Sequence, residues 1–451
     1  MAFLLFLQLL LLPLTLAFPS HYSRDAVPVR PLNDSFYTPP VGYESTAPGT
    51  ILRSRTPPYP ISAFSLAKVN IAAAHQLLYR TTDTFGNASA TVSTILVPHN
   101  ADYTKLLSYQ VAEDASNPNC APSYAFQLHS AAEDGPLGLV MPQLELVFIA
   151  SALEKGWVVT VPDHLGPKGT FLANTMSGHA VLDGIRAAKL SSNFTHIADH
   201  PTISLWGYSG GSLASGFAAE LQPSYAPELD IAGAALGGTV PRILPVIEAA
   251  NKSPFAGLIP SGIQGLANEY PVIQKLIEEN IVPEKMAEFE KVKHLCLTGD
   301  IFQFFGQDVY NYTRNRDIFT QPDAAKVMDA NAMGQKTPKI PLFVYKSAGD
   351  EISPVNDTDT LVQNYCSNGA TVEYKRDILS EHAAMDIVGA PDAMIWLNER
   401  MNRQALKPGC SNSTSLTSLT DPGALGALGV GVVDTLLDLL GKPVGPFQFG
   451  I

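Results

Sequence analysis

A serine flanked by glycines is the clearest chemical signal in the chain. Residues 207–211 read G-Y-S-G-G; they follow an apolar run at 202–206 and precede small residues typical of the start of a helix. Because so tight a strand-to-helix turn strains the backbone, positions around the serine must lack bulky side chains, and the hydroxyl points away from the sheet. The pattern G-x-S-x-G alone is weak evidence; its setting between a strand and a helix makes Ser209 a candidate nucleophile.

A serine hydroxyl needs a histidine as its base and a carboxylate to orient that histidine. In chains with this turn, the carboxylate and then the histidine follow the serine. Two histidines come after Ser209, namely His294 and His382. His294 lies in a helical region, whereas His382 lies between a strand-like segment and a helix. We therefore expect His382 to be the general base.

The carboxylate is expected after a buried strand, because the catalytic groups of open α/β sheets gather where the parallel strands end. Residues 340–345 form an apolar run of this kind, and Asp350 lies in the loop after it. Asp350 is therefore the expected acid, with Glu351 as the first alternative and Glu381 as the second. In this arrangement His382 takes the serine proton during attack on an ester carbonyl, and the carboxylate stabilises the imidazolium.

Further donors must bind the oxyanion that forms during the attack. One is expected from the backbone N–H of Gly210, and another from the loop after an early strand, within residues 108–115. The chain has neither a P-loop nor a dinucleotide fingerprint, and its H-x-x-x-H pair, His196 and His200, lacks the glutamate of a zinc protease. We therefore expect no cofactor and no metal.

The elements that position these residues are short apolar runs alternating with longer helical stretches. This alternation predicts an α/β fold with a mostly parallel sheet flanked by helices. Between residues 239 and 339 the strand signal fades and helices punctuated by Pro and Gly take over, which predicts a helical cap inserted over the sheet. The expected core thus comprises residues 18–238 and 340–408. Residues 409–451 are expected to form a tail.

Composition favours a secreted globular protein. Of 451 residues, 46% are hydrophobic and 16% are charged, which supports a large buried interior. The 29 Lys and Arg against 42 Asp and Glu give a net charge of −13, so we expect no nucleic acid partner. Residues 1–17 form an apolar run with a small-residue end, which predicts a signal peptide and an extracellular protein. The alternative, a membrane anchor, needs a longer run.

Cysteines and sequons agree with that compartment. Four cysteines without a C-x-x-C pair predict two disulfides. Seven N-x-[S/T] sequons predict a glycoprotein, and they lie at Asn33, Asn87, Asn193, Asn251, Asn311, Asn356 and Asn412. The sequon at Asn251 is weakened by the nearby Pro254.

Taken together, these motifs resemble the fungal secretory lipases of the Candida antarctica lipase A type. The similar segments span nearly the whole mature chain and comprise residues 108–124, 182–186, 207–211, 224–229, 350–352 and 381–383. The resemblance implies an α/β-hydrolase fold with a helical cap. It also implies the triad Ser209, Asp350 and His382, and an oxyanion site formed by Asp114 and Gly210.

The same resemblance extends to covalent links and to the tail. It implies the disulfides Cys120–Cys296 and Cys366–Cys410, and it makes residues 423–449 a candidate flap over an acyl-chain tunnel. Where relatives carry an aromatic residue two positions before the oxyanion aspartate, this chain has Ala112. We expect that difference to bear on acyl-chain selectivity.

The expected function is that of a secreted carboxylic-ester hydrolase, a lipase that cleaves triacylglycerols. The large apolar cap and tail favour contact with a lipid–water interface, and we expect a monomer. Another branch of the family removes acetyl groups from trichothecene-type metabolites. The triad does not distinguish that small-ester substrate from a lipid, because selectivity lies in the pocket walls. A non-catalytic binding protein on the same scaffold is the alternative outside enzymes.

Overall fold

A ten-stranded sheet runs through the molecule. The computed structural model describes residues 27–63, 67–132 and 138–418. The strand order is β1-β4-β5-β7-β6-β8-β9-β10-β11-β12. The strands are β1 Ile51–Arg55, β4 Ala73–Thr82, β5 Ala88–Val97, β6 Asp102–Gln110, β7 Trp157–Pro162, β8 Thr202–Tyr208, β9 Ile231–Gly237, β10 Leu342–Ser347, β11 Val372–Asp377 and β12 Cys410–Ser415. A separate pair comprises β2 Ser62–Ala63 and β3 Ala67–Lys68.

Most of the sheet is parallel, as the alternating pattern predicts. The pairs from β7 through β6, β8, β9, β10 and β11 to β12 are parallel, whereas β1, β4, β5 and β7 pair antiparallel. The β4–β5 hairpin therefore precedes the parallel region in the chain. The prediction of an α/β fold with a mostly parallel sheet is confirmed.

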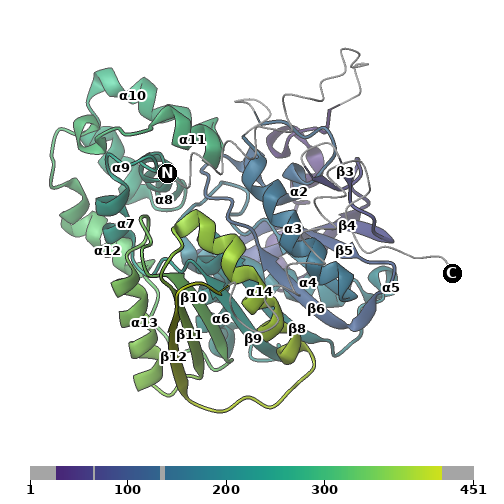
Figure 1. The fold of residues 1–451 in the computed structure, drawn as a ribbon. Helices are drawn as coiled ribbons and strands as arrows, with labels where there is room; N and C mark the ends of the chain where they lie inside the picture. Colours follow the sequence, from purple (N-terminus) through teal and green to yellow (C-terminus); the bar gives the residue numbers. More distant parts are fainter. Residues whose placement is uncertain (1–26, 64–66, 133–137, 419–451) are drawn as a thin grey trace.

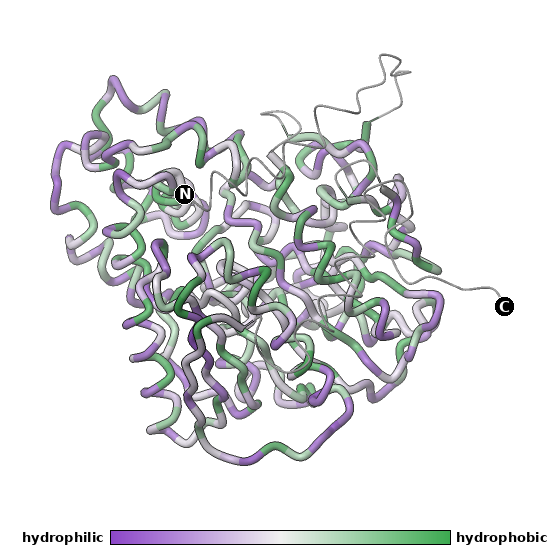
Figure 2. The backbone as a smooth tube through the Cα atoms, in the orientation of Figure 1, coloured by the Kyte–Doolittle hydropathy of each residue, from purple (hydrophilic) through white to green (hydrophobic). Residues whose placement is uncertain are grey.

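Helices cover both faces of this sheet, and each face has its own hydrophobic core (Figure 1). One core joins the sheet to α4, α6 and α13, and the other joins it to α3 and α14. These helices are α3 Val140–Glu154, α4 Asn174–Leu190, α6 Gly210–Tyr225, α13 Val355–Ser367 and α14 His382–Met401, with short helices α2 Pro122–Ala125 and α5 Ser192–Thr195. Figure 2 shows hydrophilic and hydrophobic residues alternating along α13, as expected for a helix that packs one side against a sheet.

The chain between β9 and β10 folds into helices that gather beside the sheet (Figure 1). They are α7 Ile243–Ala250, α8 Leu258–Glu269, α9 Pro271–Asn280, α10 Pro283–Phe289, α11 Leu297–Gln303 and α12 Pro322–Ala330. Their apolar faces form a third hydrophobic cluster, which includes Ile247, Leu266, Ile277 and Phe319. We call residues 239–339 the cap.

The sheet continues into the range expected to be a tail. Residues of β12 pair in parallel with β11, from Cys410 opposite Val372 to Ser415 opposite Asp377. This strand reads C-S-N-S-T-S and is mostly exposed, so it carries no apolar pattern that marks a strand in the sequence. The core therefore extends past residue 408. The remaining tail, its candidate flap at 423–449 and the expected signal peptide at 1–17 lie outside the described residues.

Two disulfides fasten the periphery. Cys120–Cys296 links the loop after β6 to the cap, and Cys366–Cys410 links α13 to β12. Both are the pairings that the resemblance implies. Among the described residues, no helix is both long and apolar enough to span a bilayer.

Candidate active site

Ser209 occupies a strained turn between β8 and α6. Its backbone has φ +48° and ψ −118°, a conformation that costs energy in any residue with a side chain. The turn leaves no room beside it: a Cβ on Gly207 would lie 2.2 Å from the carbonyl oxygen of Gly211, and one on Gly211 would lie 2.0 Å from that of Gln110. The glycines are therefore required by backbone contacts, which agrees with the sequence argument.

The expected base and acid lie next to this serine. His382 is the first residue of α14, and its Nε2 lies 2.9 Å from Oγ of Ser209. On the other side of the ring, Nδ1 lies 2.6 Å from Oδ2 of Asp350, in the loop after β10. The chain thus brings Ser209, His382 and Asp350 into one line of hydrogen bonds from the ends of three different elements.

The alternative acids, Glu351 and Glu381, and the alternative base, His294, do not take part in this line of hydrogen bonds. Glu351 accepts a hydrogen bond from the backbone N–H of His382 at 2.7 Å, so its carboxylate holds the start of α14. Glu381 is exposed and precedes α14. His294 belongs to the cap, just before Cys296.

Asp350 is held by more partners than the histidine alone. Its Oδ1 accepts hydrogen bonds from the backbone N–H groups of Ile352 at 3.0 Å and Ser353 at 2.7 Å, and its Oδ2 lies 2.8 Å from Nζ of Lys346. Burial opposes ionisation, but the positive charges of His382 and Lys346 and their hydrogen bonds hold the pKa of Asp350 well below its usual range. The carboxylate is therefore an anion throughout the pH range in which a histidine can act as a base.

The oxyanion candidates Gly210 and Asp114 adjoin each other. Asp114 has φ +43°, and a Cβ on Gly210 would lie 1.7 Å from its Oδ1, so any larger residue at position 210 would displace this carboxyl group. Gly210 is the first residue of α6, where backbone N–H groups are free of intrahelical partners. Burial raises the pKa of Asp114 to about 7, although the charge of His382 opposes the shift.

Buried polar side chains outside the catalytic motifs support the loop before Asp114. Glu145 of α3 accepts a hydrogen bond from the backbone N–H of Ala112 at 2.8 Å, and Nε2 of His164 donates to the carbonyl oxygen of Val111 at 2.9 Å. Neither residue belongs to a recognisable spacing pattern, because both act through the backbone of a distant loop. Lys346 was missed because its contact with Asp350 follows from the turn of the chain after β10.

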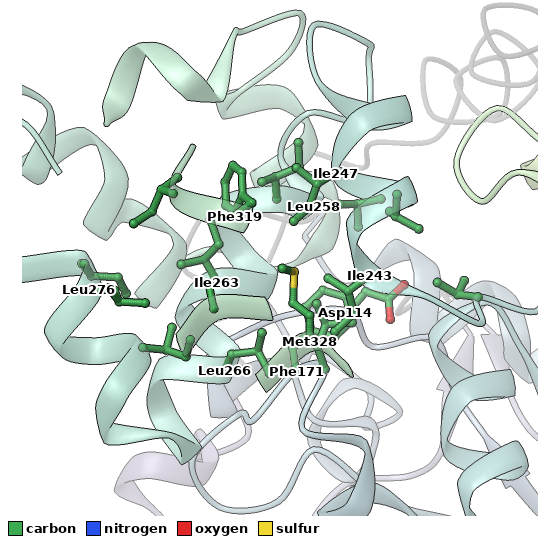
Figure 3. Close-up of a pocket in the computed structure, with 18 of the residues that line it drawn as sticks. Asp114, Phe171, Ile243, Ile247, Leu258, Ile263, Leu266, Leu276, Phe319 and Met328 are labelled. Carbon is green, nitrogen blue, oxygen red and sulfur yellow. The ribbon is translucent and has the colours of Figure 1, made fainter. Parts of the chain in front are cut away.

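A long apolar cavity opens at these residues and extends into the cap. It encloses about 1040 Å³ of empty space, part of it open to solvent, and Ser209, Gly210 and Asp114 line one part of it. Figure 3 shows its walls reaching from Asp114 past Ile263 to Leu276. The remaining walls are almost entirely aliphatic or aromatic side chains, with Asn280 and Thr313 among the few polar ones. Such a space suits a hydrocarbon chain.

The predicted glycosylation sites differ in what their amides do. Asn251 uses its side chain inside the cap, where Nδ2 donates to Asp308 at 3.0 Å and Oδ1 accepts from the backbone N–H of Val309 at 2.8 Å. The other sequon asparagines are exposed, and they are Asn33, Asn87, Asn193, Asn311, Asn356 and Asn412. The fold thus leaves these six asparagines accessible, whereas Asn251 is only half-exposed and both ends of its amide are hydrogen-bonded within the cap.

Comparisons with known proteins agree with the motif-based resemblance. A family model described as secretory lipase matches residues 133–409. Lipase A of Arthroderma benhamiae is 49% identical over 427 residues, covering 94% of this chain and 91% of that protein. Lipase 4 of Candida albicans is 39% identical over 402 residues, covering 87% of this chain and 86% of that protein.

Solved structures give the same answer for the fold. Candida antarctica lipase A in its closed state matches with a TM-score of 0.81 and 29% identity, covering 94% of this chain and all of that one (100%). The rice cell wall degrading esterase LipA from Xanthomonas oryzae matches with a TM-score of 0.59 at 16% identity, covering 80% of this chain and 100% of that one, which supports the fold alone. The α/β-hydrolase fold is confirmed, and the chain belongs to the secretory lipase family.

Proposed function

We propose that this protein is a secreted lipase that hydrolyses esters of long-chain fatty acids, triacylglycerols among them. Membership of the family makes it a carboxylic ester hydrolase. The apolar cavity supports this choice of substrate, because Ser209 lines it and nearly all of its other walls are hydrocarbon side chains. An acetyl group would leave nearly all of this space unused.

The proposed reaction follows the line of hydrogen bonds. Oγ of Ser209 attacks the ester carbonyl while Nε2 of His382 takes its proton, and Asp350 stabilises the imidazolium through Nδ1. The backbone N–H groups of Gly210 and Asp114 donate hydrogen bonds to the oxyanion. The imidazolium then protonates the departing alcohol, which leaves an acyl-enzyme, and a water activated by the same histidine releases the fatty acid.

Three exposed aliphatic side chains support contact with a lipid–water interface. Ile378 and Leu379 lie in the loop that leads to His382, and Leu416 lies beside them, since its carbonyl oxygen accepts a hydrogen bond from Leu379 at 3.1 Å. Secretion is supported by the family, by two disulfides and by six exposed sequons. We further propose that the protein works as a monomer, which light scattering checks.

The test is the rate of hydrolysis of p-nitrophenyl esters from acetyl to palmitoyl and of a triolein emulsion, by wild type and by Ser209→Ala. We expect the wild type to hydrolyse long-chain esters and the emulsion, and we expect Ser209→Ala to lose this activity. Activity confined to acetyl esters would instead assign the protein to deacetylation of small metabolites. Hydrolysis retained by Ser209→Ala would refute the nucleophile.

A further inference from the structure

A buried lysine touches the carboxylate proposed to orient the catalytic histidine. Lys346 is in β10, and its side chain has no exposed surface. Its Nζ lies 2.8 Å from Oδ2 of Asp350 and also donates to the carbonyl oxygen of Thr239 at 2.8 Å. That same Oδ2 accepts the hydrogen bond from Nδ1 of His382 at 2.6 Å. One carboxylate oxygen thus receives both an ammonium group and the imidazole.

Burial of the lysine at this position is unfavourable in itself. An ammonium group loses its hydration when it is removed from water, whereas an apolar side chain of the same length does not. Burial accordingly lowers the pKa of Lys346, and the charge of Asp350 opposes the shift. Asp350 has other donors, because Ile352 and Ser353 supply backbone N–H groups to its Oδ1.

We propose that Lys346 is a positioning residue that sets the pH range of the hydrolysis: its ammonium group offsets the charge of Asp350, so that activity extends to lower pH than it would without this charge. This inference rests on the proposed function of Ser209, His382 and Asp350. The imidazolium gains stability from the carboxylate of Asp350 and loses stability to a cation that lies within two hydrogen bonds of it.

The other titratable groups around His382 and Asp350 do not supply this cation. Glu351 in the same loop and Tyr208 at the end of β8 contact His382, and Asp114 in the loop after β6 interacts with its charge. Tyr374 in β11 interacts with Asp350, Asp357 in α13 interacts with Lys346, and Asp386 lies one turn along α14 near Tyr208. Arg242 pairs with Asp357 at 3.5 Å. Within the described part of the chain, Lys346 is the cation recorded in direct contact with the carboxylate besides the histidine itself.

The experiment measures kcat/KM on p-nitrophenyl butyrate against pH, read at the isosbestic wavelength of p-nitrophenol so that detection does not vary with pH. Lys346→Met and Lys346→Gln remove the charge, and Gln retains a donor. We expect the midpoint of the acidic limb to rise by about two pH units in both, the effect of a unit charge about 5 Å away at an effective dielectric constant of about 20. Lys346→Arg, which keeps the charge, should restore a midpoint near that of wild type.

A matched control removes another hydrogen bond to the carbonyl oxygen of Thr239 without changing any charge. Thr358 Oγ1 donates to the same carbonyl oxygen of Thr239, at 3.3 Å. Thr358→Val should therefore leave the midpoint unmoved even if it lowers stability. A lysine that served only to fill space would lower the activity of its variants at every pH without shifting the limb, and that result, or a shift to lower pH, would overturn the inference.

Near-ultraviolet circular dichroism shows which variants fold. If neither neutral variant folds, Lys346→Arg still tests the inference, because a midpoint more than about one pH unit away from that of wild type would overturn it. Ser209→Ala separates the two proposals. If that variant remains active, the proposed function fails; if it is inactive and the limb of the Lys346 variants stays in place, only the role of Lys346 fails.

Discussion

Blocking the cap cavity should shorten the acyl chain that the enzyme prefers. Ile263 of α8 lies between Asp114 and Leu276 in Figure 3, and Leu276 of α9 lies at the far side. A tryptophan at either position fills space that a hydrocarbon chain would occupy. Ile263→Trp should therefore exclude more of the chain than Leu276→Trp does.

The magnitude follows from the burial of methylene groups. Each methylene that leaves water contributes about 0.8 kcal/mol, which is about fourfold in kcat/KM if the contact is kept in the transition state. A block that excludes about four methylenes should thus reduce the ratio of kcat/KM for palmitoyl over acetyl esters by about 3 kcal/mol, or about two orders of magnitude. Activity on the acetyl ester should stay within about threefold of wild type, because that acyl group does not reach either position.

The assay is the p-nitrophenyl ester series, measured below the concentration at which the long esters aggregate. Leu190→Trp is the matched control for Leu276→Trp, because Leu190 is 61% exposed and lies at the end of α4, outside the cavity lining. Unchanged chain-length dependence in both cavity variants would refute the assignment of the cavity to the acyl chain. An equal fall on every ester, acetyl included, would show damage to the reaction itself.

Three further predictions concern the site and its support. Gly210→Ala would place a Cβ 1.7 Å from Oδ1 of Asp114, so kcat should fall by about 10²- to 10³-fold, as when one oxyanion donor is lost, with KM changed little. Burial raises the pKa of Asp114 to about 7 and that of Asp386 to about 8. Between the ordinary carboxyl pKa near 4 and these raised values, the folded chain binds more protons than the unfolded chain, so the melting temperature should fall as the pH rises from 5 to 8. Asp386→Asn should reduce that fall, and a rise of the melting temperature in calorimetry would contradict the prediction. Replacing Cys366 and Cys410 together by Ala should lower the free energy of unfolding by about 4 kcal/mol, because the disulfide closes a loop with a sequence separation of 44, and urea denaturation checks this.

The sequence predicted best what depends on local backbone geometry. The strained turn at Ser209, between a strand and a helix, requires small residues, and these stand in consecutive positions of the sequence. Asp350 and His382 were placed by chain order and by the ends of strands, and the structure sets them within hydrogen-bonding distance of their expected partners. Asp114 came from the resemblance and not from chemistry, because several residues of its loop could supply a backbone donor.

What the sequence did not reveal depends on contacts that no local sequence pattern records. Lys346 appears in the sequence as a lysine at the end of an apolar run, and its pairing with Asp350 follows only from a turn of the chain after β10. Glu145 lies in a helix with mostly apolar neighbours, and its partner is a backbone group more than thirty residues earlier in the chain (separation 33). The polar edge strand β12 has no periodic pattern because one of its edges and most of its side chains face water.

Ser209 should carry a long acyl group during turnover. To detect it, the protein is mixed with p-nitrophenyl palmitate, quenched in acid within the first turnovers and digested, and the palmitoyl group is located by mass spectrometry. We expect a palmitoyl ester on the peptide that contains Ser209, and none on that peptide in Ser209→Ala. Continued release of palmitate with the acyl group found on another residue would show that Ser209 is not the nucleophile.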